Sequence, residues 1–180
     1  MTTTRILAGQ VLHFDSTPFA GDPLSAARID SAGGLLIRDG RILATGPAAE
    51  LRAAHPGAEL IDHGQALLVP GFVDAHAHYP QTAMIASWGK RLIDWLNLYT
   101  FPEEMRFADP AYAGAIAARY FDLTAAHGTT TICSFCTIHP ASVDAFFTEA
   151  RARGQRVVAG KTCMDRNAPE GLRDTAQSAF

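Results

Sequence analysis

The stretch Leu68-Val-Pro-Gly-Phe-Val-Asp-Ala-His-Ala-His-Tyr-Pro-Gln81 decides the fold class of this chain. Its apolar, strand-like run ends in two histidines, His76 and His78, which are two positions apart. In an extended strand, residues i and i+2 project to the same side, so both imidazoles can face a single point. Zinc binds imidazole nitrogen at about 2.0–2.1 Å, and two histidines supply half of a four-ligand shell. We therefore predict a metal site here.

Asp74 is two positions before His76, so its side chain is expected on the same side of the strand. There it either ligates the metal or orients a ligand. A His-x-His pair is common by chance, and its position is more informative than its spacing. The pair ends a predicted strand over Leu67–His76 and precedes an irregular loop. Active sites of parallel barrels lie at this end of their strands, which favours metal ligation over a structural role.

Downstream of residue 67, apolar strand-like runs alternate with amphipathic helical runs, a pattern typical of a parallel α/β fold. The predicted strands are Leu67–His76, Thr129–Phe135 and Arg156–Thr162. One predicted helix has Asp109 as its N-cap and is closed by Gly128, and another spans Ala141–Arg153 with Gly154 after its last turn. A further amphipathic piece covers Leu92–Leu98.

The first 66 residues read as β-structure. We predict a strand over Arg5–Phe14, a hairpin over Leu35–Ala44 whose turn is Asp39-Gly40, and a short helix over Glu50–Ala54. The predicted division is a β-rich accessory segment over residues 1–66 and an α/β segment over residues 67–180.

Composition limits the classes of partner. The 180 residues are 48% hydrophobic and carry a net charge of −3, with 15 scattered basic residues, so we expect no nucleic-acid partner. We also expect no membrane association and no signal peptide, because no apolar run is long enough. Three cysteines do not make a disulfide framework, and a cytoplasmic location is the default expectation.

Several other residues admit two interpretations. Cys133 and Cys136 form a C-x-x-C, but positions three apart on a strand point to opposite faces, so we interpret both as structural. Lys161 is expected to be structural or pocket-lining, paired with Asp165. His127 is expected to interact with a helix C-terminus. His139 is either a pocket residue or a helix-entry residue, and three aromatic side chains either stack on a ligand or belong to the core: Trp95, Tyr99 and Phe101.

The segment Pro70-Gly-Phe-Val-Asp74 followed by His-Ala-His resembles the first-strand signature of the amidohydrolase superfamily. Within it, the chain is similar to the guanine deaminase family at His78-Tyr-Pro-Gln81, Asp94-Trp-Leu-Asn97, Tyr99-Thr-Phe-Pro-Glu103, Gly128-Thr-Thr-Thr131 and Gly160-Lys-Thr-Cys-Met-Asp-Arg-Asn167. The resemblance implies a (β/α)8 TIM barrel with a small β-sandwich accessory domain. Such barrels take about 250 residues, so only about three β/α units are expected here and the chain is expected to be partial.

The resemblance also implies a function. It makes His76 and His78 ligands of one Zn2+ per subunit, and it makes His78, Tyr79, Pro80 and Gln81 substrate-binding residues, with Gln81 reading a small purine substrate. The implied reaction is hydrolytic deamination of guanine to xanthine and ammonia by a homodimer. The general acid/base glutamate and the other metal ligands are expected beyond Phe180, so the chain alone is expected to be inactive.

Three alternatives stay open at the sequence level. The first is another amidohydrolase, either a different deaminase or a cyclic-amide hydrolase. The second is a catalytically inactive barrel used as a scaffold, against which the intact His76 and His78 argue. The third is a truncated product with a regulatory role.

Overall fold

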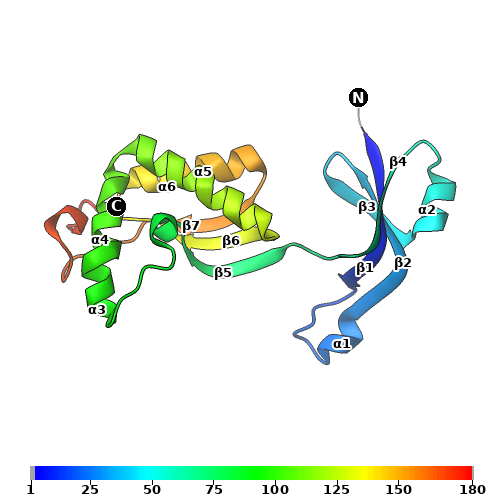
Figure 1. Ribbon diagram of the computed structural model, residues 1–180, viewed down its shortest axis with the longest axis horizontal. Helices are drawn as coiled ribbons and strands as arrows, with labels where there is room; N and C mark the ends of the chain where they lie inside the picture. Colours follow the sequence, from blue (N-terminus) through cyan, green and yellow to red (C-terminus); the bar gives the residue numbers. More distant parts are fainter. Residues whose placement is uncertain (1–2, 180) are drawn as a thin grey trace. The chain divides into compact units, whose positions relative to one another are not determined.

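A computed structural model describes residues 3–179 and divides the chain into two compact units, one up to Pro70 and one from Gly71 onward. Figure 1 shows the elements of each unit. Within residues 3–179, no helix combines the length and the hydropathy that a membrane span requires.

The first unit is a four-stranded mixed sheet with the order β3-β2-β1-β4. Strands β1 and β2 pair antiparallel, as do β2 and β3, whereas β1 and β4 pair parallel. The core of this unit contains Ile6, Val11 and Leu36. The elements are β1 (Thr4–Phe14), α1 (Pro23–Ala26), β2 (Ala27–Arg38), β3 (Arg41–Pro47), α2 (Ala48–Ala54) and β4 (Glu59–Leu68).

The sequence-based elements of this unit are confirmed. Strand β1 contains the predicted strand, and α2 contains the predicted helix. The turn residues Asp39 and Gly40 have φ values of 52° and 71°, as a type I′ hairpin turn requires. Residues 3–70 form a single sheet, so the second layer of the expected sandwich is not among them.

The second unit is a three-stranded parallel sheet with the order β5-β6-β7, formed by β5 (Phe72–His78), β6 (Thr129–Phe135) and β7 (Arg156–Gly160). Its connections contain α5 (Pro110–Ala126) and α6 (Pro140–Arg153), and Figure 1 shows both helices on one face of the sheet. The core between helices and sheet includes Tyr79, Phe121, Ile132 and Phe146. This strand–helix–strand order is that of the first units of a (β/α)8 barrel.

A run of short helical elements follows β5 and leads into α5. It consists of η1 (Tyr79–Met84), α3 (Leu92–Trp95), η2 (Leu96–Thr100), α4 (Phe101–Met105) and η3 (Arg106–Ala108). The amphipathic piece predicted over Leu92–Leu98 is thus helical. One more turn, η4 (Glu170–Leu172), follows β7 and packs on α4 through Leu172 and Phe101.

The helix boundaries follow from local chemistry. Asp109 caps α5 by accepting a hydrogen bond from the Ala111 N–H at 2.9 Å, and α6 ends at Gly154, whose φ is 66°. At the end of α5, the Nδ1 atom of His127 lies 2.8 Å from the carbonyl oxygen of Leu123. All three features agree with the sequence-based predictions.

The predicted strand over Leu67–His76 was wrong at both ends. Leu67 and Leu68 belong to β4, where they pair with β1, and β5 begins only at Phe72. Pro70 has no N–H to donate in a β-ladder, and a side chain at Gly71 would collide with Thr130. The chain leaves the first sheet and enters the second around this pair of residues. Strand β7 also ends earlier than predicted, at Gly160 instead of Thr162.

Candidate metal-binding site

His76 and His78 converge at the C-terminal end of β5. Their Nε2 atoms lie 3.3 Å apart, and their ring centroids are 5.3 Å apart. Both side chains are exposed on the sheet face opposite the helices. The same-side arrangement predicted from the two-residue spacing is therefore present.

The distance between the two nitrogens fits a shared tetrahedral metal ion. Two ligand atoms at about 2.0–2.1 Å from a tetrahedral centre lie about 3.3 Å from each other, the separation that His76 and His78 show. Within residues 3–179, no group of three or more His, Cys, Asp or Glu side chains is arranged to hold a metal. The described residues thus bring together two of the four donors that a tetrahedral zinc site has.

The surroundings of His78 favour its neutral form. Burial lowers the pKa of His78, and the neighbouring His76 lowers it further. A metal binds only the neutral imidazole, because protonation occupies the lone pair of the nitrogen. Burial and the neighbouring His76 thus both favour the neutral form of His78, which is the form that binds a metal.

Asp74 does not lie on the same side of the strand as the two histidines, which corrects the prediction. The register of β5 against β6 shifts between Asp74 and Ala77, so Asp74 pairs with Ile132, whose side chain faces the helices. Burial raises the pKa of Tyr120, a residue of α5, to about 12, and the charge of Asp74 is the second cause of this rise. The Asp74 carboxylate also accepts a hydrogen bond from the His76 N–H at 3.1 Å. It fixes the backbone of a candidate ligand and does not join the two imidazoles.

The side chains of Tyr79 and Pro80 are fully buried, so the backbone is the part of these two residues that is left to contact substrate. The Tyr79 ring packs against Phe146 with centroids 4.9 Å apart, and its hydroxyl donates to the Ser142 carbonyl oxygen. Its backbone N–H donates to Ser134 Oγ at 3.0 Å. Tyr79 therefore anchors the chain between the candidate ligand His78 and the loop that follows.

Gln81 is half-buried and lines a cavity of about 600 Å³ together with His78 and Trp95. The cavity extends along α5 as far as His127, and only its end at His78 and Gln81 lies at the C-terminal edge of the sheet. Ligand pockets have volumes of about 300–1,000 Å³. The position of Gln81 is thus compatible with ligand contact.

Sequence reasoning missed Glu104, a residue of α4 whose side chain is only 8% exposed. Burial raises the pKa of Glu104 to about 7, and the neighbouring Gln81 side chain opposes that rise. A Pro-Glu-Glu run early in a helix is ordinary, and nothing in it indicates a buried acid.

Sequence reasoning also missed Phe135, the last residue of β6. Its ring stacks on His78 with centroids 5.0 Å apart and meets His76 edge-on at 5.6 Å. The signal lay in the two predicted strands, because parallel neighbours that end together bring their last residues side by side.

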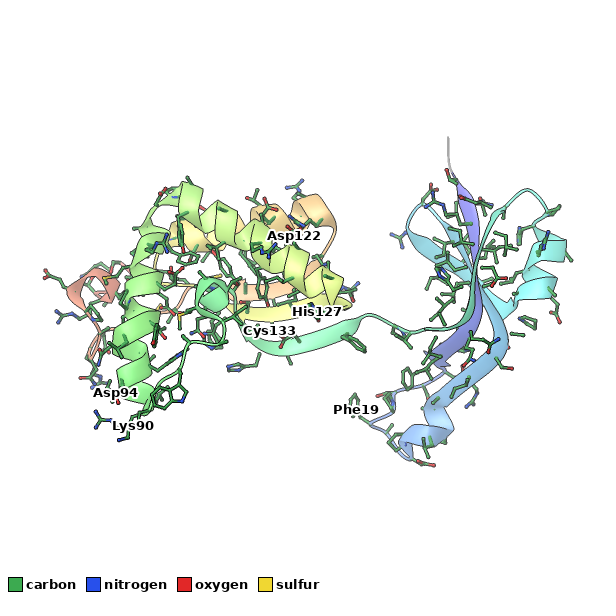
Figure 2. The ribbon with its side chains drawn as sticks, in the orientation of Figure 1. Phe19, Lys90, Asp94, Asp122, His127 and Cys133 are labelled. Atoms are coloured by element: carbon green, nitrogen blue, oxygen red, sulfur yellow. The ribbon has the colours of Figure 1, made fainter. Side chains whose placement is uncertain are left out.

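The remaining candidate residues have structural explanations. Cys133 is exposed and Cys136 is buried, so the two side chains diverge as predicted for positions three apart on a strand. Figure 2 shows Cys133 on the sheet and His127 at the end of α5. Lys161 pairs with Asp174 at 2.6 Å and not with Asp165, which corrects that prediction.

His139 immediately precedes α6 as its N-cap residue, and burial lowers its pKa. Its Nε2 atom is buried and has no hydrogen-bond partner among the described residues. Of the three aromatic candidates, Phe101 is a core residue and Trp95 lines the cavity at Gln81. Tyr99 lines a separate cavity beside α4.

Comparison with known proteins decides the family. The model of the amidohydrolase family matches residues 67–179, which is more than half of the chain. The chain belongs to the amidohydrolase family. Residues 33–58 match a second model, described as an imidazolonepropionase-like composite domain of bacteria.

Several relatives of this chain are guanine deaminases. The guanine deaminase of Escherichia coli (strain K12) is 43% identical over 157 residues, which cover 87% of this chain and 36% of that protein. The crystal structure of guanine deaminase from Bradyrhizobium japonicum superposes with a TM-score of 0.88 at 38% identity, over 97% of this chain and 38% of that one.

A second similar structure is guanine deaminase from C. acetobutylicum with guanine bound in its active site, with a TM-score of 0.81 at 28% identity. It covers 98% of this chain and 40% of that chain. The chain thus spans well under half of the length of these relatives, and the expected fold, the first part of an amidohydrolase (β/α)8 barrel, is confirmed.

Proposed function

We propose that the complete protein carrying this chain is a zinc-dependent hydrolase that converts guanine to xanthine and ammonia. The observation that carries the proposal is the 3.3 Å separation of the His76 and His78 Nε2 atoms at the C-terminal edge of a parallel sheet. Its support from relatives is the 43% identity to the guanine deaminase of Escherichia coli.

His76 and His78 are the residues of this chain that would hold the ion. When bound, zinc lowers the pKa of a water molecule and so supplies hydroxide near neutral pH. The two imidazoles contribute neutral nitrogen donors, and Tyr79 fixes the end of the strand that carries them. The remaining ligands and the glutamate that moves the proton must come from elsewhere in the complete protein.

Gln81 is the residue that we propose to recognise the purine. Its amide has two N–H donors and one acceptor oxygen, and guanine presents both donors and acceptors along its edges. Gln81 lines the same cavity as His78, so its amide is placed within reach of a ligand bound beside that histidine. We place Tyr79 and Pro80 in a supporting role, since both side chains are buried.

Replacing each histidine by alanine in the complete protein tests the proposal. We expect His76→Ala and His78→Ala each to lose the metal and to lower kcat/KM for guanine about a thousandfold, since a catalytic metal contributes several kcal/mol. His63→Ala, an exposed histidine of the first unit, is the matched control and should leave both quantities unchanged. Metal analysis and xanthine formation are the measurements.

Two results would contradict the proposal. One is xanthine formation at the wild-type rate by a metal-free His76→Ala protein. The other is turnover of cytosine or a hydantoin by the wild-type protein with none of guanine, which would favour another amidohydrolase activity. The homodimer and the cytoplasmic location remain predictions, which light scattering and cell fractionation test.

A further inference from the structure

The two imidazoles lack the usual support of metal ligands. A ligating histidine normally donates its second ring N–H to a carboxylate, carbonyl or water, which fixes the ring. In the part of the chain that the structure describes, the only hydrogen-bond contact of either ring is the one between His76 and His78. Among the described residues, packing against neighbouring side chains is therefore what limits rotation of the two rings.

Phe135 contacts both rings at once. Its ring lies nearly parallel to that of His78, with an interplanar angle of 23° and centroids 5.0 Å apart. The same ring meets His76 at 60° with centroids 5.6 Å apart. One side chain thus touches both candidate ligands, each in a different favourable aromatic geometry.

The strand register explains why Phe135 reaches this point. Residues 78 and 135 are direct neighbours in the parallel pairing of β5 and β6. Ile132 and Ser134 of β6 are buried, whereas Cys133 and Phe135 are exposed, as alternation along a strand requires. Phe135 therefore lies on the same open face as the histidines.

The chemistry of the side chain suits this place. Phe135 is 46% exposed, so it is not a buried core residue. A phenyl ring neither donates nor accepts a strong hydrogen bond, and it leaves the Nε2 lone pairs free. An aspartate or histidine in the same place would compete for the metal.

We infer that Phe135 is a positioning residue that holds the His76 and His78 imidazoles in the orientation that binds one metal ion. The inference rests on the part of the proposed function in which these two histidines are ligands. It adds an aromatic side chain of the neighbouring strand that acts on the metal only through them.

The test compares Phe135→Ala, Phe135→Leu and Phe135→Tyr in the complete protein. Zn2+ dissociation constants are measured by chelator competition, and the absorption spectrum of the Co2+-loaded protein reports the ligand geometry. We expect Phe135→Ala to weaken Zn2+ binding about tenfold to a hundredfold, the range seen when a residue that orients a metal ligand is replaced. Phe135→Leu should be intermediate, and Phe135→Tyr should restore the affinity because it keeps the ring.

Phe147→Ala is the matched control, because Phe147 of α6 has a similar exposure of 42% and contacts neither histidine. Circular dichroism in excess chelator identifies any variant that fails to fold, and Phe135→Leu then carries the test. At saturating Zn2+, kcat of Phe135→Ala should return to within a few-fold of the wild-type value.

Two outcomes would overturn the inference. One is unchanged Zn2+ affinity and an unchanged Co2+ spectrum in Phe135→Ala. The other is a raised KM for guanine with unchanged Zn2+ affinity, which would make Phe135 a substrate contact instead. Failure of the proposed function is distinguishable, because the wild-type protein and His76→Ala would then bind Zn2+ alike.

Discussion

At the scale of single residues, Glu104 shows how burial and polarity compete near the site. The side chain is almost fully buried, and the neighbouring Gln81 side chain only partly offsets the loss of water. Burial disfavours the charged form, so the pKa rises from 4.5 to about 7. The acid therefore titrates within the physiological range, next to the residue that we propose to read the substrate.

The raised pKa of Glu104 predicts in which direction the free energy of unfolding changes with pH. The folded state keeps its proton up to about pH 7, while the unfolded state loses it near pH 4.5. The contribution of protonated Glu104 is thus fully present below pH 4.5 and is lost as the pH rises through 7. At about 1.4 kcal/mol per pKa unit, the loss is on the order of 3 kcal/mol.

Glu104→Gln tests this sign, because glutamine has the same shape and does not titrate. Between pH 5 and pH 8, denaturant unfolding of the complete protein should show the wild type losing stability relative to the variant. All other titrating groups are shared, so the difference isolates Glu104. Parallel pH profiles for the two proteins would mean that the burial of Glu104 does not shift its pKa.

At the scale of elements, the helix ends show how local chemistry sets the boundaries. Gly154 ends α6 with a φ of 66°, and an added Cβ would meet no atom within 4 Å. Gly114 lies inside α5 and is equally open, but its φ is not positive. The two glycines therefore differ in backbone conformation and not in packing.

This difference predicts opposite effects of the same substitution. Gly154→Ala should destabilise the complete protein by about 1 kcal/mol, because an L-residue is strained in the left-handed region. Gly114→Ala should stabilise it by about 0.5–1 kcal/mol, because alanine loses less backbone freedom in a helix. Thermal unfolding of both variants is the measurement. A change of the same sign in both would contradict the account.

Elements with strong local signals could be predicted from sequence. Strand β6, the cap at Asp109 and the end of α6 at Gly154 all follow from residue chemistry. The start of β5 could not, since the apolar run that includes Leu67 and Leu68 continues across two sheets and only tertiary pairing divides it. The face of Asp74 depends on a register shift between strands, which no periodicity reveals.

The candidate site was also predictable only where its features depend on local sequence. The convergence of His76 and His78 depends on a two-residue spacing in one strand, so sequence alone indicates it. The roles of Phe135 and Glu104 depend on contacts with other elements, β5 and η1, that lie far away in the chain. The resemblance to the guanine deaminase family assigns Tyr79 to the substrate, but packing turns its ring into the core.

At the scale of the whole molecule, the sheet of the second unit has one covered and one open face. Helices α5 and α6 cover one face, while Val73 and Val158 on the other face are exposed. Parallel sheets are normally covered on both faces, so this one calls for a further layer. We expect the remainder of a barrel to supply that layer in the complete protein and to bring the missing ligands to the two imidazoles.

The most direct test of the central claim is the position of the metal in crystals of the complete protein grown with Zn2+. Anomalous diffraction at the zinc edge locates the ion independently of activity. We predict one peak at about 2.0–2.1 Å from the Nε2 atoms of both His76 and His78. A zinc peak bound by other residues, with these two rings turned apart, would contradict the account.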